Sequence, residues 1–316
     1  MHLACKVGVV VPAYNEEKLI EQTIRTMPSF VDRIIVVDDC SQDRTAEIVE
    51  SVARESEGRI LLLRHEVNQG VGRAIASGYR KAMEEGYEVV VVMNGDAQMD
   101  PRDLIRIIDP VAKREADYAK GNRLFREESW QMIPKYRYLG NSVLSFMTKV
   151  ASGYWHIADS QSGYTAISLI ALKRLELDQI YPRYGAPNDI LVRLNTHNFR
   201  VRDVSVRPVY NIGEKSGIKL YKVIPTISWL LFKGFWRRMV HKYIIQDFHP
   251  LIFFYLLAFG ALTLSAFFLF RTIYYWIQMG SVPSTSFLVF WFLLISGLNS
   301  LFFAMWFDME SNRHLR

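Results

Sequence analysis

Polar side chains follow a buried apolar stretch near residue 90. Val89–Val92 are four consecutive valines, and Asn94, Asp96, Gln98 and Asp100 follow them at alternate positions. A continuous β-branched run predicts a strand buried on both faces, and open α/β sheets bind ligands where such strands end. Carboxylate and amide oxygens suit a hard divalent cation, which in turn suits a diphosphate. An ordinary turn is the alternative, because Asn-Gly and Asp-Pro are common in loops.

Three earlier predicted strands also end in polar residues. They span 6–12, 31–39 and 59–65, and a helical pattern follows each. Alternating strands and helices predict an α/β fold with a parallel, open sheet over the first 115 residues. The strand ends then share one edge, across which a nucleotide can lie. The polar residues at this edge are Asn15, Glu16, Asp38, Asp39, Asn68, Asn94 and Asp96, and Asn15 also suits the N-cap of the first helix.

Several function classes are disfavoured. Gly70-Val71-Gly72 is not a dinucleotide fingerprint, because no Gly-x-Gly-x-x-Gly follows the first strand, and no Walker-type loop occurs. The net charge of +6 does not by itself indicate nucleic-acid binding. The basic residues of the chain gather just before residue 250, which indicates a membrane surface instead. Cys5 and Cys40 form no metal-binding spacing or disulfide framework.

The C-terminal part predicts a membrane anchor. Residues 251–270 and 287–307 carry no charge, and each is long enough to cross a hydrocarbon core of about 30 Å. We predict a catalytic domain at 1–220, interfacial amphipathic helices at 221–248 and a two-helix transmembrane hairpin at 249–316. The interfacial segment is indicated by its tryptophans and cations, which are Trp229, Trp236, Lys222, Lys233, Arg237, Arg238 and Lys242.

Charge asymmetry predicts the orientation of this anchor. The predicted linker between the spans has one basic residue, Arg271, against the cluster before residue 250. The positive-inside rule then places the catalytic domain and both termini in the cytoplasm. Tyr274–Trp276 fit the opposite interface.

Four stretches resemble family 2 glycosyltransferases of the GT-A fold, and within that family polyprenyl-phosphate sugar synthases of the dolichol-phosphate mannose synthase type. The stretches are Val10–Glu17, Val36–Thr45, Asn68–Ala74 and Gly95–Pro101, and the resemblance extends over roughly residues 6–220. It implies a Rossmann-like sheet, a UDP- or GDP-linked sugar donor, Mg²⁺ or Mn²⁺, and inverting transfer of one sugar to a polyprenyl phosphate at the membrane. A homo-oligomer stays open.

The resemblance also assigns roles on the donor side. Asp96 matches the second acid of the Asp-x-Asp motif and would ligate the metal, with Gln98 and Asn94 as further ligands. Asn94 departs from the family, because an amide stands where the motif has its first aspartate, and it contributes no charge. The predicted nucleotide-binding residues are Pro12, Ala13, Tyr14, Glu16, Asp38, Asp39, Asn68, Asn94, Gly95, Asp96 and Lys215, with Asp38 or Asp39 at the base or ribose.

On the acceptor side, Arg123, Arg137 and Asn141 fall where the synthases hold the lipid phosphate. Independently of the resemblance, a phosphate acceptor needs cationic donors, and guanidinium groups bind its oxygens in pairs. The alternative for any single arginine is a solvated surface charge. The resemblance also places the donor sugar beside Asp159, Ser162 and Gly163.

Asp189 is the candidate acidic residue of the acceptor helix, and Asn188 replaces the glutamate that precedes it in the family. Local sequence favours N-capping for Asn188. A phosphate monoester has a second pKa of about 6 and is already a nucleophile at neutral pH, so Asp189 is predicted to assist without being an essential base. Two alternatives stay open: transfer to a lipid-linked saccharide or glycerolipid hydroxyl, with Asp189 as base, and an inactive binding or assembly protein.

Overall fold

The computed structural model of the chain describes residues 2–124, 135–207, 209 and 220–316. Side chains at 135–139, 141 and 220–223 also lie outside this description. Arg137 and Asn141 are therefore placed only as positions on a helix, and Lys215 lies outside the described residues.

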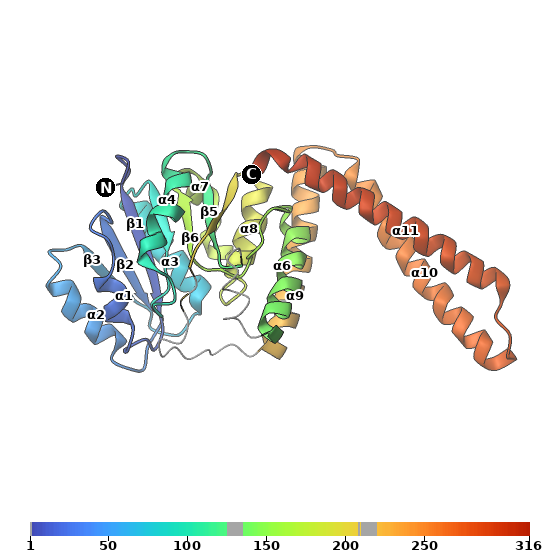
Figure 1. Cartoon of the computed structure of the whole chain (residues 1–316), viewed down its shortest axis with the longest axis horizontal. Helices are drawn as coiled ribbons and strands as arrows, with labels where there is room; N and C mark the ends of the chain where they lie inside the picture. The colour runs from blue at the N-terminus through green and yellow to red at the C-terminus, as the bar shows by residue number, and fades with distance from the viewer. Residues whose placement is uncertain (1, 125–134, 208, 210–219) are drawn as a thin grey trace. The chain divides into compact units, whose positions relative to one another are not determined.

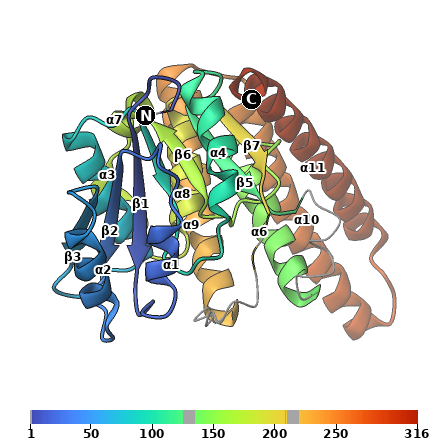
Figure 2. The same cartoon turned by 60° about the vertical axis from the view of Figure 1, so that its left-hand side comes forward.

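A seven-stranded sheet in the order β3-β2-β1-β4-β6-β5-β7 forms the centre of the first part of the chain (Figures 1 and 2). The strands are β1 (Val7–Ala13), β2 (Arg33–Asp38), β3 (Ile60–Arg64), β4 (Val89–Val92), β5 (Tyr118–Asn122), β6 (Thr165–Ser168) and β7 (Val201–Ser205). Parallel pairing of β1 with β2 and β4, and of β2 with β3, confirms the predicted parallel half. The sequence missed β6, which runs antiparallel between β4 and β5.

Helices cover both faces of the sheet because the strands are apolar on both. Val7, Val9 and Val11 of β1 pack toward one core, and Val10 packs toward the other. The first core includes residues of α1 (Ile20–Arg25), α2 (Thr45–Arg54) and α4 (Leu104–Ala112). The second includes residues of α3 (Val71–Glu84), α7 (Leu169–Arg174) and α8 (Ala186–Thr196). Helix α6 (Lys135–Ser152) lies between β5 and β6 in the chain, and short 3₁₀ turns occur at Pro101–Asp103 and Leu177–Gln179.

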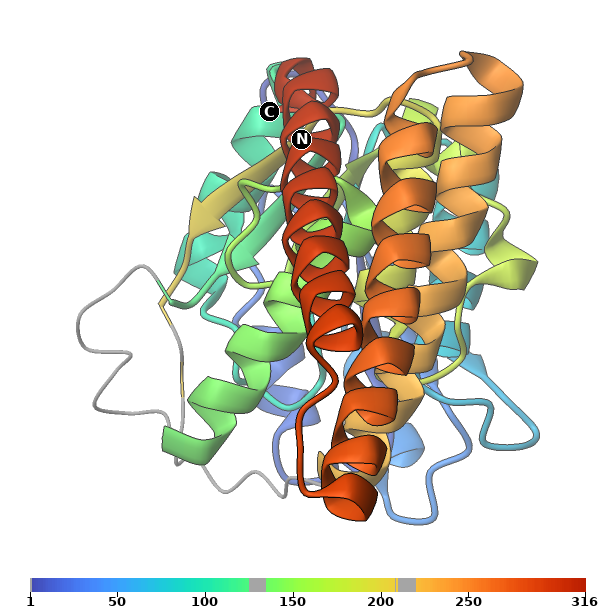
Figure 3. The same cartoon turned by 90° about the vertical axis from the view of Figure 1, so that its right-hand side faces the viewer.

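The chain forms two compact units, 1–236 with 315–316, and 237–314. The helix α9 (Leu220–Val240) is continuous, and a π-helical turn, His241–Gln246, follows it. In the second unit, α10 (Leu251–Met279) and α11 (Ser284–Ser311) lie side by side (Figure 3). Both helices are long and apolar enough to cross a membrane by length and composition. A short 3₁₀ turn, Arg313–Leu315, ends the chain.

The two helices extend beyond the spans that the sequence predicted. Arg271 and Tyr274–Trp276 belong to α10, and only residues 280–283 separate the two helices. Cations and aromatic residues do not end a helix, whereas Gly280 does, because it adopts a left-handed φ of 67° that glycine tolerates.

Two cations that the sequence assigned to an interfacial surface are buried instead. Arg238 donates from Nη1 and Nη2 to Asp308 at 2.7 and 3.0 Å, and Tyr243 donates to the same carboxylate at 2.8 Å. Lys242 donates to Asn312 at 2.7 Å. Asp308 follows the apolar span that the sequence ended at residue 307, so its pairing with Arg238 needed the tertiary structure.

Candidate active site at the strand ends

The loop after β4 packs against the end of β1. Gly95 N–H donates to the Pro12 carbonyl at 3.2 Å, and a Cβ built on Gly95 would lie 3.4 Å from Ala13 Cβ. Three predicted donor-site residues, Pro12, Ala13 and Gly95, are thus adjacent. Tyr14 follows them and is exposed, so its ring is accessible to a nucleoside.

Asp96 lies in a tight turn of this loop. Its Oδ1 accepts from Gln98 N–H at 3.1 Å, and Ala97 between them has a left-handed φ of 54°. Asn94 is on the same loop, and its amide lies beside Gly163, where a built Cβ would be 3.5 Å from Asn94 Oδ1. The structure therefore places Asn94, one of the predicted metal ligands, beside a predicted donor-sugar residue.

The charge of this edge fits a divalent cation. Burial, followed by the negative charges of Asp96 and Asp43, raises the pKa of Glu16 to about 7. Such crowding of carboxylates is relieved when a cation binds. Within the described part of the chain, no group of three or more His, Cys, Asp or Glu side chains is arranged to hold a metal. The predicted set has one carboxylate and two amides, and oxygen donors of this kind still fit Mg²⁺ or Mn²⁺.

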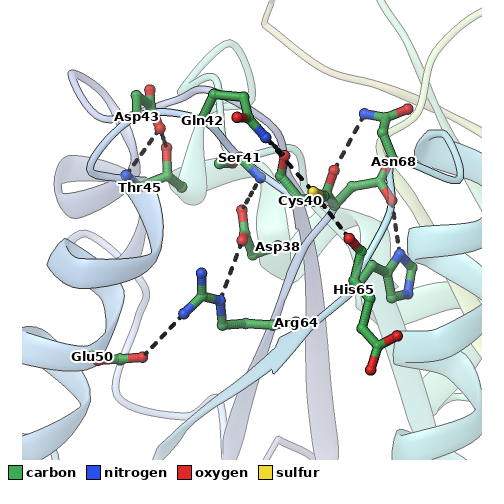
Figure 4. A network of polar contacts seen from close by, with 12 residues as sticks. Asp38, Cys40, Ser41, Gln42, Asp43, Thr45, Glu50, Arg64, His65 and Asn68 are labelled. Carbon is green, nitrogen blue, oxygen red and sulfur yellow. Dashed lines mark hydrogen bonds and ion pairs between the residues drawn. The ribbon is translucent and has the colours of Figure 1, made fainter.

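Asp38 ends β2 and Asp39 follows it, and the two aspartates have different surroundings (Figure 4 labels Asp38 with its neighbours Ser41 and Arg64). Asp39 accepts from Gln69 and Gly70 N–H at 2.9 and 2.7 Å, and its Oδ1 lies 2.7 Å from His65 Nδ1. Asp38 accepts from Ser41 N–H at 3.3 Å, and its buried Oδ2, which has no hydrogen-bond partner among the described residues, forms an ion pair with Arg64 Nε at 3.7 Å. Asp39 therefore holds the backbone at the start of α3, whereas Asp38 accepts from a single backbone N–H among the described residues.

The motif around Gly70 and Gly72 joins two loops. Asn68 Nδ2 donates to the Asp39 carbonyl at 3.2 Å, and Gly72 N–H donates to the Pro182 carbonyl at 2.8 Å. A Cβ on Gly72 would lie 2.0 Å from the Tyr181 carbonyl oxygen, so glycine is required for this approach. The start of α3 is thus occupied by protein groups, in agreement with the absence of a dinucleotide fingerprint.

Arg123 and Asp159 form one ion pair, although the sequence assigned them to different substrates. Arg123 donates from Nε at 2.7 Å and from Nη2 at 3.1 Å to the two oxygens of Asp159. Asp159 is 1% exposed and Arg123 is 26% exposed. Burial opposes ionisation of Asp159, but the charge and hydrogen bonds of Arg123 prevail and hold its pKa below the usual range.

Sequence reasoning missed Lys120, which lies beside this pair on β5. Its side chain is fully buried, and Nζ donates to the Ser162 carbonyl. Asp203 of β7 lies nearby and accepts from Asn122 Nδ2 at 2.6 Å and from Ala158 N–H at 3.0 Å. A lysine directly after Tyr118-Ala119 on a short predicted strand was the available signal.

The start of α8 differs from its prediction. The N-cap is Gly185, so N-capping by Asn188 is wrong; Asn188 lies one turn inside, where its Oδ1 is 3.1 Å from both Thr148 Oγ1 and Gln161 Nε2. Asn15 does not cap α1 either, because that helix begins only at Ile20. The Asn15 side chain instead accepts from Gln42 N–H at 2.8 Å.

Asp189 is buried and engaged. Its Oδ2 accepts from Arg193 Nε at 3.0 Å and from Tyr181 N–H at 3.1 Å. Arg193 is held in turn by Glu176 at 3.0 Å and by the Gln179 carbonyl at 2.7 Å. This carboxylate therefore orders the loop before α8 as well as the helix itself.

Known proteins share both the sequence pattern and the fold. A UDP-N-acetylglucosamine–dolichyl-phosphate N-acetylglucosaminyltransferase of Methanococcus voltae is 31% identical over 214 residues, covering 64% of this chain and 85% of that protein. An undecaprenyl-phosphate mannosyltransferase of Micrococcus luteus is 28% identical over 233 residues, covering 71% and 93%.

Among solved structures, a glucosyl-3-phosphoglycerate synthase of Mycobacterium tuberculosis, in complex with Mn²⁺, UDP and glucosyl-3-phosphoglycerate, aligns with a TM-score of 0.53. Its identity is 18%, and the alignment covers 74% of this chain and 80% of that one, which shows the GT-A-like fold alone. The sequence pattern described as "Glycosyl transferase family 2" matches residues 8–175 of 316. This match and the M. voltae relative establish that the chain belongs to glycosyl transferase family 2.

Proposed function

We propose that this family 2 glycosyltransferase moves one sugar, with inversion, from a nucleotide-sugar donor to a polyprenyl phosphate at the cytoplasmic face of a membrane. This is supported by the names of two relatives, which are transferases for dolichyl phosphate and undecaprenyl phosphate. Two apolar helices long enough to cross a membrane support a lipid acceptor. The donor base and sugar stay open.

One observation in the site carries the choice of a phosphate over a hydroxyl acceptor. Asp189, the candidate base, is buried and already accepts from Arg193 and Tyr181 N–H. A hydroxyl acceptor needs a base that can take its proton, whereas a phosphate dianion does not. The pairing of Asp189 therefore favours the acceptor that needs no base.

The residues of the strand-end edge then have separate tasks. Asp38 accepts from the nucleoside, and Arg123 orients the acceptor phosphate. Asp96, with Asn94 and Gln98, would hold a divalent cation, which supplies positive charge to the donor diphosphate. A phosphate oxygen bonds to the anomeric carbon as the bond from that carbon to the diphosphate breaks, and no proton has to move. Opposite faces for attack and departure give inversion.

The test is a screen of radiolabelled UDP- and GDP-sugars against polyprenyl phosphates, with the purified full chain in detergent. We expect one donor to yield a lipid product that mild acid releases, and we expect EDTA to stop the reaction until Mg²⁺ or Mn²⁺ is restored. A product that survives mild acid would identify a hydroxyl acceptor.

Labelling of a single cysteine placed in 280–283, in a chain lacking Cys5 and Cys40, tests the orientation: reagent from the cytoplasmic side must not reach it.

A further inference from the structure

Lys120 is a buried cation for which the reaction outlined above has no task. It lies on β5 with a fully buried side chain, and its Nζ donates to the Ser162 carbonyl. Removing an ammonium group from water costs free energy unless neighbouring groups compensate it. The neighbours of Lys120 therefore indicate what its charge is for.

Charged groups surround Lys120 from β7, which carries Asp203, from the segment before β6, which carries Asp159, and from Arg123 just after β5. Asp159 and Asp203 favour its charged form, while Arg123 and, above all, burial oppose it and lower its pKa to about 8. When all four groups are ionised, two cations balance two anions. Asp203 keeps one buried oxygen, Oδ1, without a hydrogen-bond partner among the described residues.

The ion pair of Arg123 and Asp159 depends on this balance. Arg123 binds Asp159 through Nε and Nη2, and the arginine is the partly exposed member of the pair. An isolated pair of this kind is neutral overall and attracts a phosphate dianion only weakly. Lys120 also acts on Asp159, since its charge helps to lower the pKa of that carboxyl. With the charge of Asp159 shared between two cations, Arg123 keeps positive potential toward solvent.

We propose that Lys120 is a positioning residue for the acceptor phosphate: it offsets the charge of Asp159 and holds the Ser162 carbonyl, so that Arg123 presents a positive face to the acceptor. This rests on the proposed phosphate acceptor and adds the electrostatic support of its site.

Binding of dodecyl phosphate to the purified full chain tests the proposal without turnover. By calorimetry in detergent at pH 7.5, Lys120→Met should weaken binding at least about tenfold, which is about 1.4 kcal/mol. The matched control is Lys113→Met, because Lys113 is half-exposed at the end of α4 and pairs with Asp109 at 2.7 Å. It should change binding less than about twofold. Affinity for UDP with Mn²⁺ should be unchanged in both variants.

Two further measurements separate charge from packing. Asp203→Asn removes a negative charge and should tighten dodecyl phosphate binding, and K120M combined with D203N should recover part of the loss. A purely structural lysine would give neither effect. In the unaltered protein, affinity should fall as pH rises through about 8 while the ligand stays a dianion, because Lys120 loses its proton. Arg123 does not titrate there, and ionised Asp159 and Asp203 stay constant.

Each outcome decides the matter. Equal affinity of K120M and the unaltered chain, or no binding of dodecyl phosphate by the unaltered chain, overturns the proposal. If K120M does not fold, D203N and the pH profile still decide it, and a flat profile with unchanged D203N affinity contradicts it. Failure of the proposed function is recognised separately: dodecyl phosphate binds, yet no nucleotide sugar supports transfer to a polyprenyl phosphate.

Discussion

Two carboxylates at the candidate site are held in different ways. Asp96 is half-buried in a turn and accepts from Gln98 N–H, on the loop where a cation would reduce the crowding of negative charge with Glu16. Asp189 is buried against Arg193, so its charge is compensated within the protein. A carboxylate crowded by other negative charges suits a metal, whereas the hydrogen-bonding capacity of one paired with arginine is already used within the protein.

Replacement of Asp96 by asparagine is expected to lower kcat by at least about 100-fold and to abolish Mn²⁺-dependent UDP binding, since the metal loses its carboxylate ligand. The converse change, Asn94→Asp, should tighten Mn²⁺ binding about tenfold because ligand charge increases. Steady-state kinetics and calorimetry measure both. Asp100→Asn is the control, since Asp100 pairs with Arg102 at 2.7 Å; activity lost equally there would contradict a special role for Asp96.

Asp189→Asn should keep turnover within about tenfold of the unaltered chain, because the phosphate acceptor needs no base. It should also lower the melting temperature, since loss of one partner of a buried pair costs about 3–5 kcal/mol. Glu176→Gln, which alters the exposed partner of the same Arg193, should be milder. Complete loss of turnover with donor and acceptor still bound would favour a hydroxyl acceptor.

Asp203→Asn should make stability less dependent on pH. Burial raises the folded-state pKa of Asp203 to about 6, so the ionised form is disfavoured in the folded protein. That cost is fully present above about pH 6 and is relieved as pH falls toward the unfolded value of about 4. At pH 7.5 the variant should be more stable by about 1–3 kcal/mol, and the difference should vanish near pH 4. Thermal unfolding across this range measures it, and a constant difference would contradict the assignment.

At the scale of elements, the start of α3 connects the donor edge to the loop before α8. Asp39 accepts from Gln69 and Gly70 N–H, and Gly72 N–H donates to the Pro182 carbonyl. Tyr181, the neighbour of Pro182, donates its N–H to Asp189. These contacts therefore connect the end of β2 with α8, and the absence of a side chain at Gly72 allows them.

Gly72→Ala should destabilise the chain by more than about 2 kcal/mol and raise KM for both substrates, because its Cβ would overlap a backbone oxygen, that of Tyr181. Gly140→Ala in α6 is the matched control, since nothing lies within 4 Å of its built Cβ. There alanine should be neutral or stabilising by up to about 1 kcal/mol. Thermal unfolding and kinetics compare the two, and equal effects would show that the contact at Gly72 has no consequence.

At the scale of the whole molecule, the second unit has its own polar core outside the apolar spans. Arg238 and Asp308 are both fully buried and doubly hydrogen-bonded, and Tyr243 binds the same carboxylate. They join the end of α9 to the end of α11 within this unit. Removing one partner of such a buried charge pair destabilises a protein more than replacing both partners by apolar residues.

Asp308→Ala should destabilise the second unit by about 3–5 kcal/mol, because Arg238 is left buried without its anion. The double replacement R238M with D308L should recover most of that stability. Glu310→Gln is the control, since Glu310 pairs with Arg313 at the surface and should have little effect. Thermal unfolding of the full chain in detergent measures all three, and a double variant as unstable as D308A would refute the pairing argument.

The local pattern of apolar and polar residues was sufficient to predict half of the sheet and the two apolar helices. The valine-rich strands, the alternation with helices and the two uncharged stretches predicted the parallel half of the sheet and the apolar hairpin, because burial of a strand or span requires a continuous run of apolar residues. The four family-like motifs placed the candidate donor residues at strand ends. Parallel pairing among β1, β2, β3 and β4 brings those ends to one edge of the sheet.

Only the tertiary structure decided which polar groups compensate one another. The structure forms the pairs Arg123–Asp159, Arg193–Asp189 and Arg238–Asp308. From the sequence, Arg123 and Asp159 had been assigned to different substrates, Asp189 to assisting the transfer and Arg238 to a membrane surface. The antiparallel β6 and the buried Lys120 were also missed. A charge is compensated by whichever group folding brings within a few ångströms, and local sequence does not specify contacts between residues far apart in the chain.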